Sequence, residues 1–391
     1  MKQTARIIST YSADVFGVCS ALFELGGMTV MHDASGCNST YTTHDEPRWY
    51  DMDSMVYISG LSEMEAIMGD DDKLIRDIAD AAGSLHPKFI ALAGTPVPAM
   101  TGFDYEAVAA VIEQETGIPS FGFPTTGMNT YIHGASMALA GIAERFVRER
   151  KAGEKKTGTD AGSDADPISV NILGLTPLDF SVNGTDRSIA SFLERSGFRV
   201  NSRWAMGADL EELSRAADAD VSLVVSAAGL GAAHVLKRRF GIPFVAGLPL
   251  GDRLGRLLCA ALRSAAAFGD DKVCGSSLES KGVVLIGEGI TSLALASAIE
   301  LETGKGTKVL CATECEPGIL REKDTLTPDE DDIIPELKGA QIIIADPLYR
   351  PICPPEAKFI EAPSEAFSGR IYRQEIIDPV SDLYKLLEEV L

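Results

Sequence analysis

The chain has 391 residues, of which 45% are hydrophobic and 24% are charged, as in a folded protein with two or three domains of about 100 to 150 residues each. Its 57 acidic and 35 basic residues give a formal net charge of -22. This charge disfavours binding to nucleic acid or to an anionic membrane surface, because both would repel the protein. The sequence has no apolar run of the roughly 20 residues that a membrane-spanning helix needs. Its start lacks the long apolar region of a signal peptide, so we expect a cytoplasmic protein.

The seven cysteines are odd in number and widely scattered, which is typical of free thiols rather than of a disulfide framework or a zinc ribbon. The most informative of them is Cys37, which lies in a Gly-Cys turn after an apolar strand. Gly36 allows the backbone to approach an inorganic core closely, and amides near such a turn can stabilise a thiolate. The turn therefore predicts a ligand of a metal cluster, and a buried structural thiol is the alternative.

Short apolar strands alternate with amphipathic helices along the chain, which predicts parallel sheets covered on both faces. The expected strands are residues 88–93, 168–174, 221–226, 282–287, 307–311 and 340–345, and the expected helices are residues 105–115, 186–196 and 292–302. The polar, small-residue segment 151–167 is expected to be a linker or an exposed loop. We therefore predict an α/β fold of three Rossmann-like, doubly wound units, with domains at residues 1–150, 168–270 and 271–391.

Residues 287–292, Gly-Glu-Gly-Ile-Thr-Ser, follow an apolar strand and nearly match the dinucleotide-binding fingerprint. Glu314 follows the next strand, where an acid that binds a ribose can lie. However, Ser292 takes the place of the third glycine, and Glu288 would bring a negative charge close to a pyrophosphate. Such turns also occur for packing alone. We favour packing and keep an NAD-linked dehydrogenase as an alternative function.

Several segments resemble the motifs of one known family and follow one another in the same order. Residues 32–37, His-Asp-Ala-Ser-Gly-Cys, resemble a His-Gly-x-x-Gly-Cys turn that carries a cluster ligand, and residues 61–74 resemble a Glu-Asp-x-x-Phe-Gly-Gly segment. Residues 95–104, 345–349 and 359–363 resemble later turns and strands of that family. On these grounds the chain resembles the nitrogenase component 1 family. That family includes molybdenum-iron protein subunits, cofactor-assembly scaffolds, and protochlorophyllide and nickel-sirohydrochlorin reductases.

The chain also departs from the family pattern at its ligand positions. Family members with an interfacial iron-sulfur cluster supply three cysteines per subunit, and here only Cys37 lies at a matching place. The first position falls near residues 11–13 and the third at Pro96, and none of these residues is a cysteine. The segment that carries the cofactor-binding cysteine of the nitrogenase catalytic subunit reads Val-Val-Ser-Ala-Ala at residues 224–228. We therefore expect no iron-molybdenum cofactor.

The resemblance implies a set of site residues around the Gly-Cys turn. Cys19 lies in an apolar helix expected near that turn, so Cys19 and Cys37 from two protomers could complete the four thiolates of a shared 4Fe-4S cluster. The alternative is that Cys19 is a core thiol. His32 and His44 bracket the turn, and either can tune a cluster, bind a carboxylate or donate a proton.

The resemblance further implies a homodimer or a pairing with a sister component 1 subunit, and electrons from an ATP-dependent iron-sulfur reductase like nitrogenase component 2. The function we predict is a low-potential reduction, or the handling of a metallocofactor or tetrapyrrole, in the cleft between units. A cluster-free scaffold or cofactor-binding subunit of the same fold is the alternative. The sequence identifies neither the substrate nor the catalytic residues.

Other candidate residues give weaker signals. Cys311 and Cys315 have a spacing that matches no zinc or redox signature, so we expect them to pack or to lie exposed. Cys353 lies in a proline-rich loop, where a thiol without function is expected. Residues 43–49, Thr-His-Asp-Glu-Pro-Arg-Trp, are suited to a contact with a subunit or reductase, and a solvated loop is the default interpretation.

Overall fold

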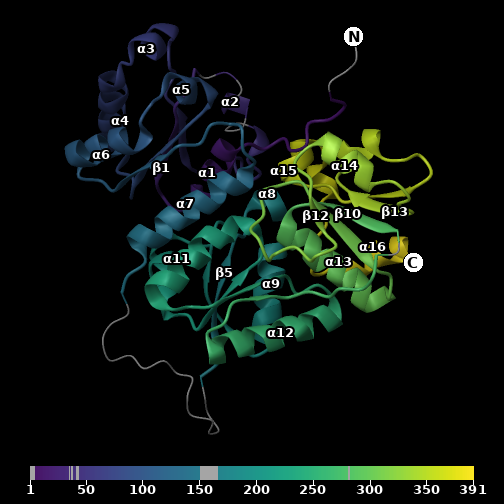
Figure 1. Ribbon diagram of the computed structural model, residues 1–391. Coiled ribbons are helices and arrows are strands. Elements are labelled where there is room, and N and C mark those ends of the chain that lie inside the picture. The colour runs from purple at the N-terminus through teal and green to yellow at the C-terminus, as the bar shows by residue number, and fades with distance from the viewer. Residues whose placement is uncertain (1–4, 35, 37, 41–43, 150–165, 281) are drawn as a thin grey trace.

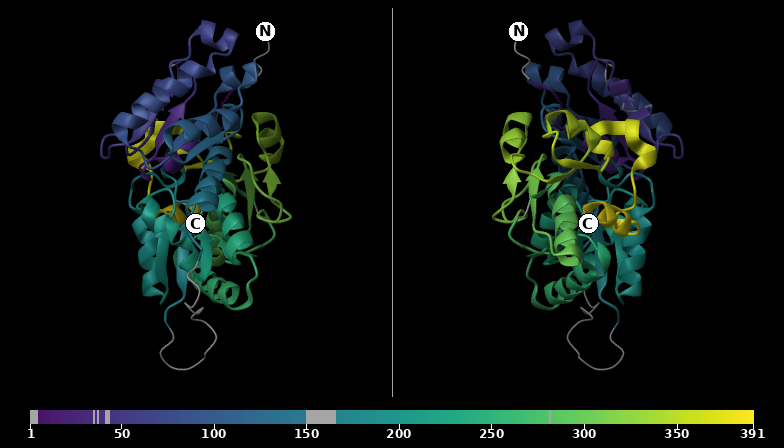
Figure 2. Two further views of the ribbon diagram at one scale, coloured as in Figure 1. Left: turned by 90° about the vertical axis from the view of Figure 1, so that its left-hand side faces the viewer. Right: turned by 90° about the vertical axis from the view of Figure 1, so that its right-hand side faces the viewer.

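The computed structural model describes residues 5–34, 36, 38–40, 44–149, 166–280 and 282–391. Within these residues the strands form three sheets, of four, five and five strands, and neighbouring strands are parallel wherever a pairing is recorded. In Figure 1 the first sheet lies at the upper left, the second below it and the third at the right. The side views in Figure 2 again place the N-terminal unit above the second. The predicted α/β class with parallel sheets is confirmed.

The first sheet has the strand order β2-β1-β3-β4. Its strands are β1 (Met28–Met31), β2 (Met55–Ile58), β3 (Ile90–Ala93) and β4 (Ser120–Phe123). Its helices are α1 (Asp14–Leu22), α2 (Asn38–Thr40), α3 (Glu63–Met68), α4 (Asp71–Leu85), α5 (Pro96–Thr101), α6 (Tyr105–Thr116) and α7 (Tyr131–Phe146). α3 begins at a capping box, in which Ser62 and Glu65 each bind the other's backbone amide.

The second sheet has the order β6-β5-β7-β8-β9. Its strands are β5 (Ser169–Leu173), β6 (Arg199–Arg203), β7 (Val221–Val224), β8 (Phe244–Ala246) and β9 (Lys272–Val273). Its helices are α8 (Pro177–Phe180), α9 (Thr185–Arg195), α10 (Leu210–Ser214), η2 (Ala216–Asp218), η3 (Ala227–Gly229), α11 (Leu230–Phe240) and α12 (Gly251–Phe268). Each residue of the central strands β5, β7 and β8 is buried, as expected for a sheet covered on both faces.

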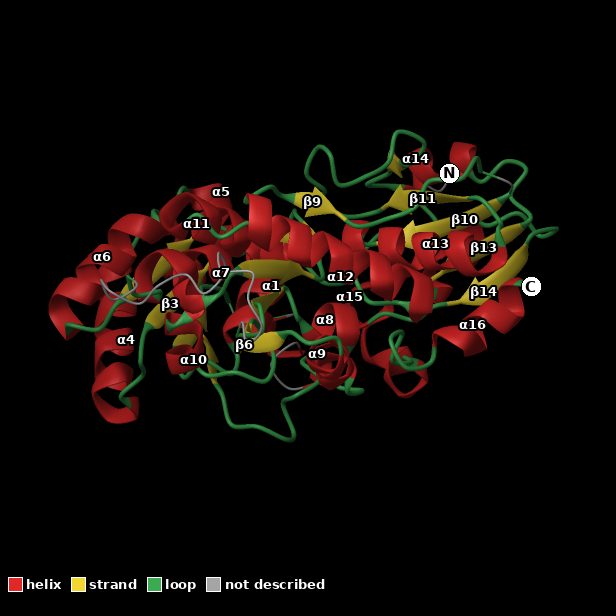
Figure 3. Cartoon of the chain, turned by 90° about the horizontal axis from the view of Figure 1, so that it is seen from below, coloured by secondary structure: helices red, strands yellow, loops and turns green. Residues whose placement is uncertain are grey.

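The third sheet has the order β12-β11-β10-β13-β14. Its strands are β10 (Val283–Gly287), β11 (Thr307–Cys311), β12 (Thr325–Leu326), β13 (Ile342–Ala345) and β14 (Lys358–Glu361). Its helices are α13 (Gly289–Thr303), α14 (Glu330–Glu336), η4 (Pro347–Ile352), α15 (Glu365–Ser368), η5 (Gly369–Glu375) and α16 (Leu383–Val390). Figure 3 shows these strands together beside α13 and α16, at the end of the molecule where the chain ends.

The larger hydrophobic core includes residues of all three units, and a smaller one lies between the first sheet, α4 and α6. α7 connects the first unit to the second. α7 packs against α1 on one side and α11 on the other, and glycines bring the helices close. A Cβ at Gly17 would lie 2.0 Å from the Tyr131 carbonyl oxygen, and a Cβ at Gly134 would lie 1.8 Å from the Asp14 carbonyl oxygen. Neither position accepts a side chain without moving the backbone.

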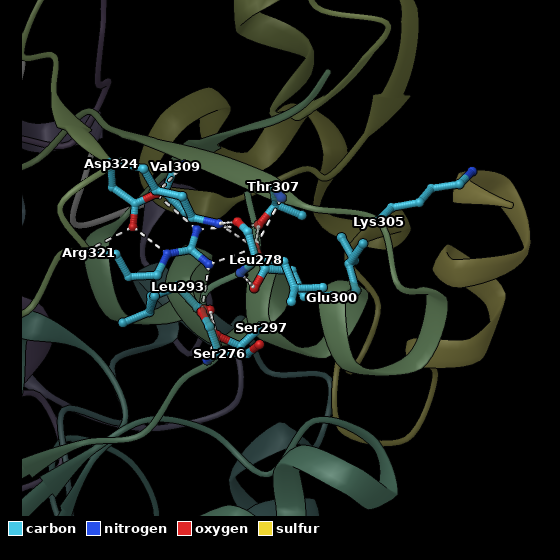
Figure 4. A network of polar contacts seen from close by, with 12 residues as sticks. Ser276, Leu278, Leu293, Ser297, Glu300, Lys305, Thr307, Val309, Arg321 and Asp324 are labelled. Carbon is cyan, nitrogen blue, oxygen red and sulfur yellow. Dashed lines mark hydrogen bonds and ion pairs between the residues drawn. The ribbon is translucent and has the colours of Figure 1, made fainter. Parts of the chain in front are cut away.

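A buried ionic network fixes the segment before β10 to the start of β11 (Figure 4). Glu300, with no exposed side-chain surface, pairs with Arg321 at 3.1 Å and with Lys323 at 2.5 Å, and it accepts the Thr307 amide and hydroxyl at 3.0 and 2.9 Å. Burial raises the pKa of Glu300, but these donors outweigh burial, so the pKa lies below its ordinary value. The network therefore needs Glu300 in its ionised form.

The expected elements were found, most of them with shifted ends. The strand expected at residues 307–311 is β11 with the same bounds, whereas β7 ends two residues early because residues 227–229 turn into η3. α13 begins at Gly289 rather than Ser292. Residues 151–165 of the expected linker lie outside the described residues, and the domain boundaries stay a prediction. Over the part of the chain that is described, no helix has the length and apolar character needed to cross a membrane.

Candidate functional site

The three units meet at the start of α7. Tyr131 is fully buried there, and the Thr130 that precedes it is held by Glu314 of the third unit, which accepts the Thr130 amide at 2.9 Å and its hydroxyl. The carboxylate of Asp14 in α1 accepts the Gly127 amide of the same loop at 2.7 Å. The loop after β4 is therefore fixed by two carboxylates, and Tyr131 enters the junction.

The carboxyl group of Asp179 collects three hydroxyl donors at this junction. Asp179 lies in α8, just after β5, and one of its oxygens accepts the Tyr131 hydroxyl. The other oxygen accepts Ser226 Oγ at 2.6 Å and Thr176 Oγ1 at 2.9 Å. Thr176 also caps α8, because its Oγ1 accepts the Asp179 amide at 3.2 Å. The cluster thus joins α7 of the first unit to the ends of two strands in the second sheet.

Glu288 brings a second carboxylate to the junction from the third unit. It is buried and accepts the amides of Ile290 and Thr291 at 3.0 and 2.8 Å, at the start of α13, and the Ala227 amide at 3.0 Å. Burial first, and then the charge of Glu288, raises the pKa of Asp179 to about 7. Asp179 is thus a carboxyl group that gains or loses its proton near neutral pH.

The position of Glu288 also bears on the dinucleotide hypothesis. A dinucleotide pyrophosphate binds the free amides at the start of the helix after such a turn. Here the side chain of Glu288 already occupies those amides with a charge of the same sign. This geometry supports the interpretation of residues 287–292 as a packing turn.

Two adjoining cavities, of about 140 Å³ and about 430 Å³, open beside Asp179 at the carboxyl ends of the strands. Both are lined by Asp179, Phe180, Leu295, Ala362, Pro363 and Pro379. The smaller cavity also reaches Glu288 and Asp346, and the larger one reaches Glu361, Glu375, Lys385 and Glu389. We call this space, between the second and third sheets, the interunit cleft. Its walls are largely apolar, and most of its charged groups are carboxylates.

Asp346 is held in the wall of the interunit cleft by its own hydrogen bonds. Its carboxylate accepts the amides of Leu348 and Ser364 and the hydroxyl of Ser368, each at 2.8 Å. Burial raises the pKa of Asp346 despite these donors. The inner part of the cleft therefore presents two carboxyl groups, Asp179 and Asp346, whose pKa values are raised by burial.

The predicted tuning residue, His32, follows β1 and is buried. Its Nδ1 lies 2.9 Å from Ser59 Oγ, and its ring centre lies 4.4 Å from that of Phe103. Burial lowers the pKa of His32 to about 4, so the imidazole is neutral at neutral pH. His32 also lines a pocket of about 530 Å³ with residues of α3 and of the loop before α6.

Of the two predicted cluster ligands, the structure describes Cys19. Cys37 lies outside the described residues, so its role stays a prediction. Gly36 is exposed, and no described atom lies within 4 Å of the place where its Cβ would be. Cys19 is fully buried in α1, and burial raises the pKa of its thiol. Both properties argue against a thiolate that reaches a second protomer, and the ligand role of Cys19 stays a prediction.

The remaining ligand positions of the family pattern hold no thiol. Pro96 begins α5, and in the segment 224–228 the hydroxyl of Ser226 donates to Asp179. The side chain of Tyr11 donates to Asp45 at 2.8 Å. Among the residues described, no group of three or more His, Cys, Asp or Glu side chains is arranged to hold a metal ion.

The interpretation of residues 43–49 as a solvated loop is wrong for the part that is described. Glu46 and Arg48 are buried and form an ion pair at 2.6 Å, because α1 and the second unit cover them. Arg48 also pairs with Glu24 at 2.8 Å and donates to the Ala205 carbonyl at 2.8 Å. This segment therefore ties the first unit to the second rather than projecting toward a partner.

Sequence reasoning missed Asp179 and Tyr131. One signal was available, since Thr176-Pro-Leu-Asp179 directly follows an expected strand and is typical of a capped helix start at the ligand end of a parallel sheet. Nothing in the sequence pairs that segment with Tyr131, which lies 48 residues earlier in the chain.

Comparison with known proteins agrees with this architecture. The sequence profile described as Nitrogenase component 1 type Oxidoreductase matches residues 15–345. The chain belongs to this family. The nitrogenase molybdenum-iron protein alpha chain of Clostridium pasteurianum is 25% identical over 193 residues, which are 49% of this chain and 33% of that protein.

A second relative is the nitrogenase iron-molybdenum cofactor biosynthesis protein NifE of Nostoc sp.. It is 25% identical to this component 1 chain over 261 residues, which are 66% of this chain and 50% of that protein. The chain thus spans a third to a half of the length of these curated relatives. The solved structure titled Nitrogenase Cp1 at pH 6.5 matches all of this chain and 93% of its own, with a TM-score of 0.69 and 17% identity. At that identity the match shows the component 1 fold alone.

Proposed function

We propose that this component 1 protein is a cofactor-handling subunit that binds its ligand in the interunit cleft. The observation that carries the proposal is the hydrogen bond from the Ser226 hydroxyl to Asp179. At the place where the catalytic subunit of the family is expected to anchor its cofactor through a cysteine, this chain has a hydroxyl group that is bound to Asp179 at 2.6 Å. The cleft next to it has a volume suited to a small ligand, about 430 Å³ in its larger part.

The charges of the cleft support a ligand that is apolar and carries hydrogen-bond donors or a positive charge. Asp179, Glu288 and Asp346 line its inner part, and Lys385 is the cation among the residues that line its outer part. In their ionised forms these carboxyl groups would repel an anionic metal-sulfur cofactor. This supports the expectation that the protein holds no iron-molybdenum cofactor, and it favours an organic or cationic cargo.

Leu295 offers a direct test, because it lines both cavities. In Leu295→Trp the larger side chain should fill the cleft. Leu257→Trp is the matched control, since Leu257 is exposed on α12. We expect the neutral dye Nile red to bind wild type and Leu257→Trp, and Leu295→Trp to bind it several-fold more weakly. Small molecules extracted from the purified protein should follow the same order. Equal binding by all three proteins would refute a ligand site in the cleft.

A redox centre at the Gly-Cys turn is the second candidate, and the resemblance of residues 32–37 to the cluster-ligand turn of the family supports it. A 4Fe-4S cluster bound there would supply one-electron chemistry at low potential, with Cys37, Cys19 and their copies in a partner as the predicted ligands. Electrons would come from an ATP-dependent reductase of the component 2 type.

The surface near this turn supports a protein partner. Five apolar side chains around α3, α5 and the loop before α7 are strongly exposed: Met64, Ile67, Met68, Met100 and Met128. Exposed apolar groups of this kind mark contact surfaces when they cluster. We propose that a sister subunit or a second copy covers them.

Iron and sulfide analysis of protein purified without oxygen tests the redox candidate. We expect wild type to contain both elements and Cys37→Ala to lose them together with its absorbance in the visible range, while Cys259→Ala keeps them. Wild type without iron or sulfide, whether produced alone or with neighbouring genes, would refute the cluster. That result would leave the proposal for the interunit cleft untouched.

A further inference from the structure

Cys311 and Cys315 lie close to each other and next to Gly289, the first residue of α13. Cys311 ends β11 and is fully buried, and Cys315 is half-buried in the loop that follows. Both sulfur atoms lie within 3.5 Å of the place where a Cβ of Gly289 would be, at 3.5 Å for Cys311 and 2.8 Å for Cys315. The absence of a side chain at Gly289 therefore leaves one small space that the two thiols share.

The loop that carries Cys315 touches both other units. Glu314 binds the Thr130 amide before α7, and Glu316 lies 2.7 Å from Nε2 of His234 in α11. Cys315 lines a groove of about 450 Å³ between α7 and α11. A small molecule in this groove can reach Cys315, whereas Cys311 lies behind it.

We propose that Cys311 and Cys315 are a redox-active pair that closes to an intramolecular disulfide when a small-molecule disulfide reaches Cys315 through the groove. This role is independent of the ligand in the interunit cleft. Its consequence is local: the bond fixes the loop of residues 312–316, which contacts the first and second units, to the end of β11.

The chemistry is two steps of thiol-disulfide exchange. The Cys315 thiolate attacks one sulfur of the small disulfide, which forms a mixed disulfide and releases one small thiol. The Cys311 sulfur then attacks the Cys315 sulfur, which forms the bond between them and releases the second small thiol. The protein gives up two electrons and two protons, and both end on the two released thiols.

The environment of the pair makes this exchange slow at neutral pH. The hydrogen bond with Cys311, burial, and the charges of Glu288 and Glu316 all raise the pKa of the Cys315 thiol. Because the thiolate is the attacking species, the experiment is run at alkaline pH with glutathione and glutathione disulfide. Cys311→Ser should stop at the mixed disulfide on Cys315.

Trypsin supplies a direct readout. Cleavage after Lys308 and Arg321 releases residues 309–321, which contain Cys311 and Cys315 and no other cysteine. If remaining thiols are alkylated in denaturant, the closed peptide carries no alkyl group and is two hydrogens lighter than the dithiol. We expect closure in the folded protein at a severalfold lower proportion of glutathione disulfide than in the same protein unfolded in urea.

These outcomes distinguish a pair of thiols that the fold holds close together from two thiols that are merely present in the same chain. A folded protein that needs as much oxidant as the unfolded chain, or more, would overturn the proposal. So would folded wild type that stops at a mixed disulfide on Cys315. In Gly289→Ala, a Cβ 2.8 Å from the Cys315 sulfur should push that thiol away and raise the proportion of oxidant required. An unchanged requirement in this variant, if it folds, would contradict the shared space at Gly289.

Discussion

Asp179 allows the strongest test of how the three units meet. Its pKa is raised from 3.8 to about 7 by burial and by the charge of Glu288. A carboxyl group whose pKa is higher in the folded protein holds its proton more tightly there than in the unfolded chain. It stabilises the fold below the unfolded pKa, and this contribution is lost as the pH rises through the folded pKa. Replacing Asp179 by Asn removes the titration while keeping the shape of the side chain.

The magnitude follows from the two pKa values. Their difference of about 3 corresponds to roughly 4 kcal/mol of stability between about pH 4 and about pH 7. This is an upper limit, because Asp179 lines the cleft and keeps some accessible surface toward it. The side-chain oxygen of an asparagine can keep the Ser226 and Thr176 hydroxyls as donors, and its amide group then faces the Tyr131 hydroxyl, whose oxygen can accept from it.

The measurement is the free energy of unfolding in urea at several values of pH for wild type and Asp179→Asn. Asp270→Asn is the control, because Asp270 is exposed. Titrations of other groups cancel in the difference between wild type and each variant. We expect wild type to lose up to roughly 4 kcal/mol relative to Asp179→Asn as the pH rises from about 4 to about 8. A difference that stays constant over this range would refute the reasoning.

Four further predictions follow from single contacts. Arg48→Met leaves the buried Glu46 without its cation, so the free energy of unfolding in urea should fall by about 3 to 5 kcal/mol. Glu300→Gln should lower the melting temperature at neutral pH and have less effect in acid, because a carboxylate with a lowered pKa stabilises above its unfolded pKa and loses this as the pH falls. Gly134→Ala should give little folded protein by circular dichroism, since its Cβ would lie 1.8 Å from a backbone oxygen of Asp14. Saturating NAD should leave the melting temperature unchanged, because Glu288 occupies the amides that a pyrophosphate needs.

The fold was predictable because many of its strands are short runs rich in apolar residues that alternate with helices. Residues 307–311 illustrate this: alternation of helix and strand was enough to give β11 its observed bounds. The start of α13 differs from the expected position because of a side-chain cap. Glu288 starts α13 three residues before the expected position by accepting two helix amides, and periodicity of apolar residues carries no information on such a contact.

The site was less predictable, because its parts come from distant segments. The proton affinity of Asp179 depends on Tyr131 and Glu288, which belong to other units. No local sequence pattern indicates that these three residues lie close together in space. The segment around Arg48 was also predicted incorrectly from its local sequence. Its charged residues read as a surface loop, yet the protein buries them as an ion pair between units.

The residue types of the interunit cleft constrain its cargo more strongly than membership of the family does. A thiolate anchor and surrounding cations would suit an anionic cluster. In this chain the segment 224–228, which resembles the anchor segment of the family, instead holds a serine bound to Asp179, and both adjoining units supply carboxyl groups. Burial raises the pKa of Asp179 to about 7, so a ligand bound in the cleft as proposed would meet a neutral carboxyl group below that pH and a negative charge above it. Ligand affinity should therefore rise with pH for a cationic ligand, and this dependence should vanish in Asp179→Asn. A cationic ligand whose affinity is independent of pH in wild type would show that Asp179 does not face the bound molecule.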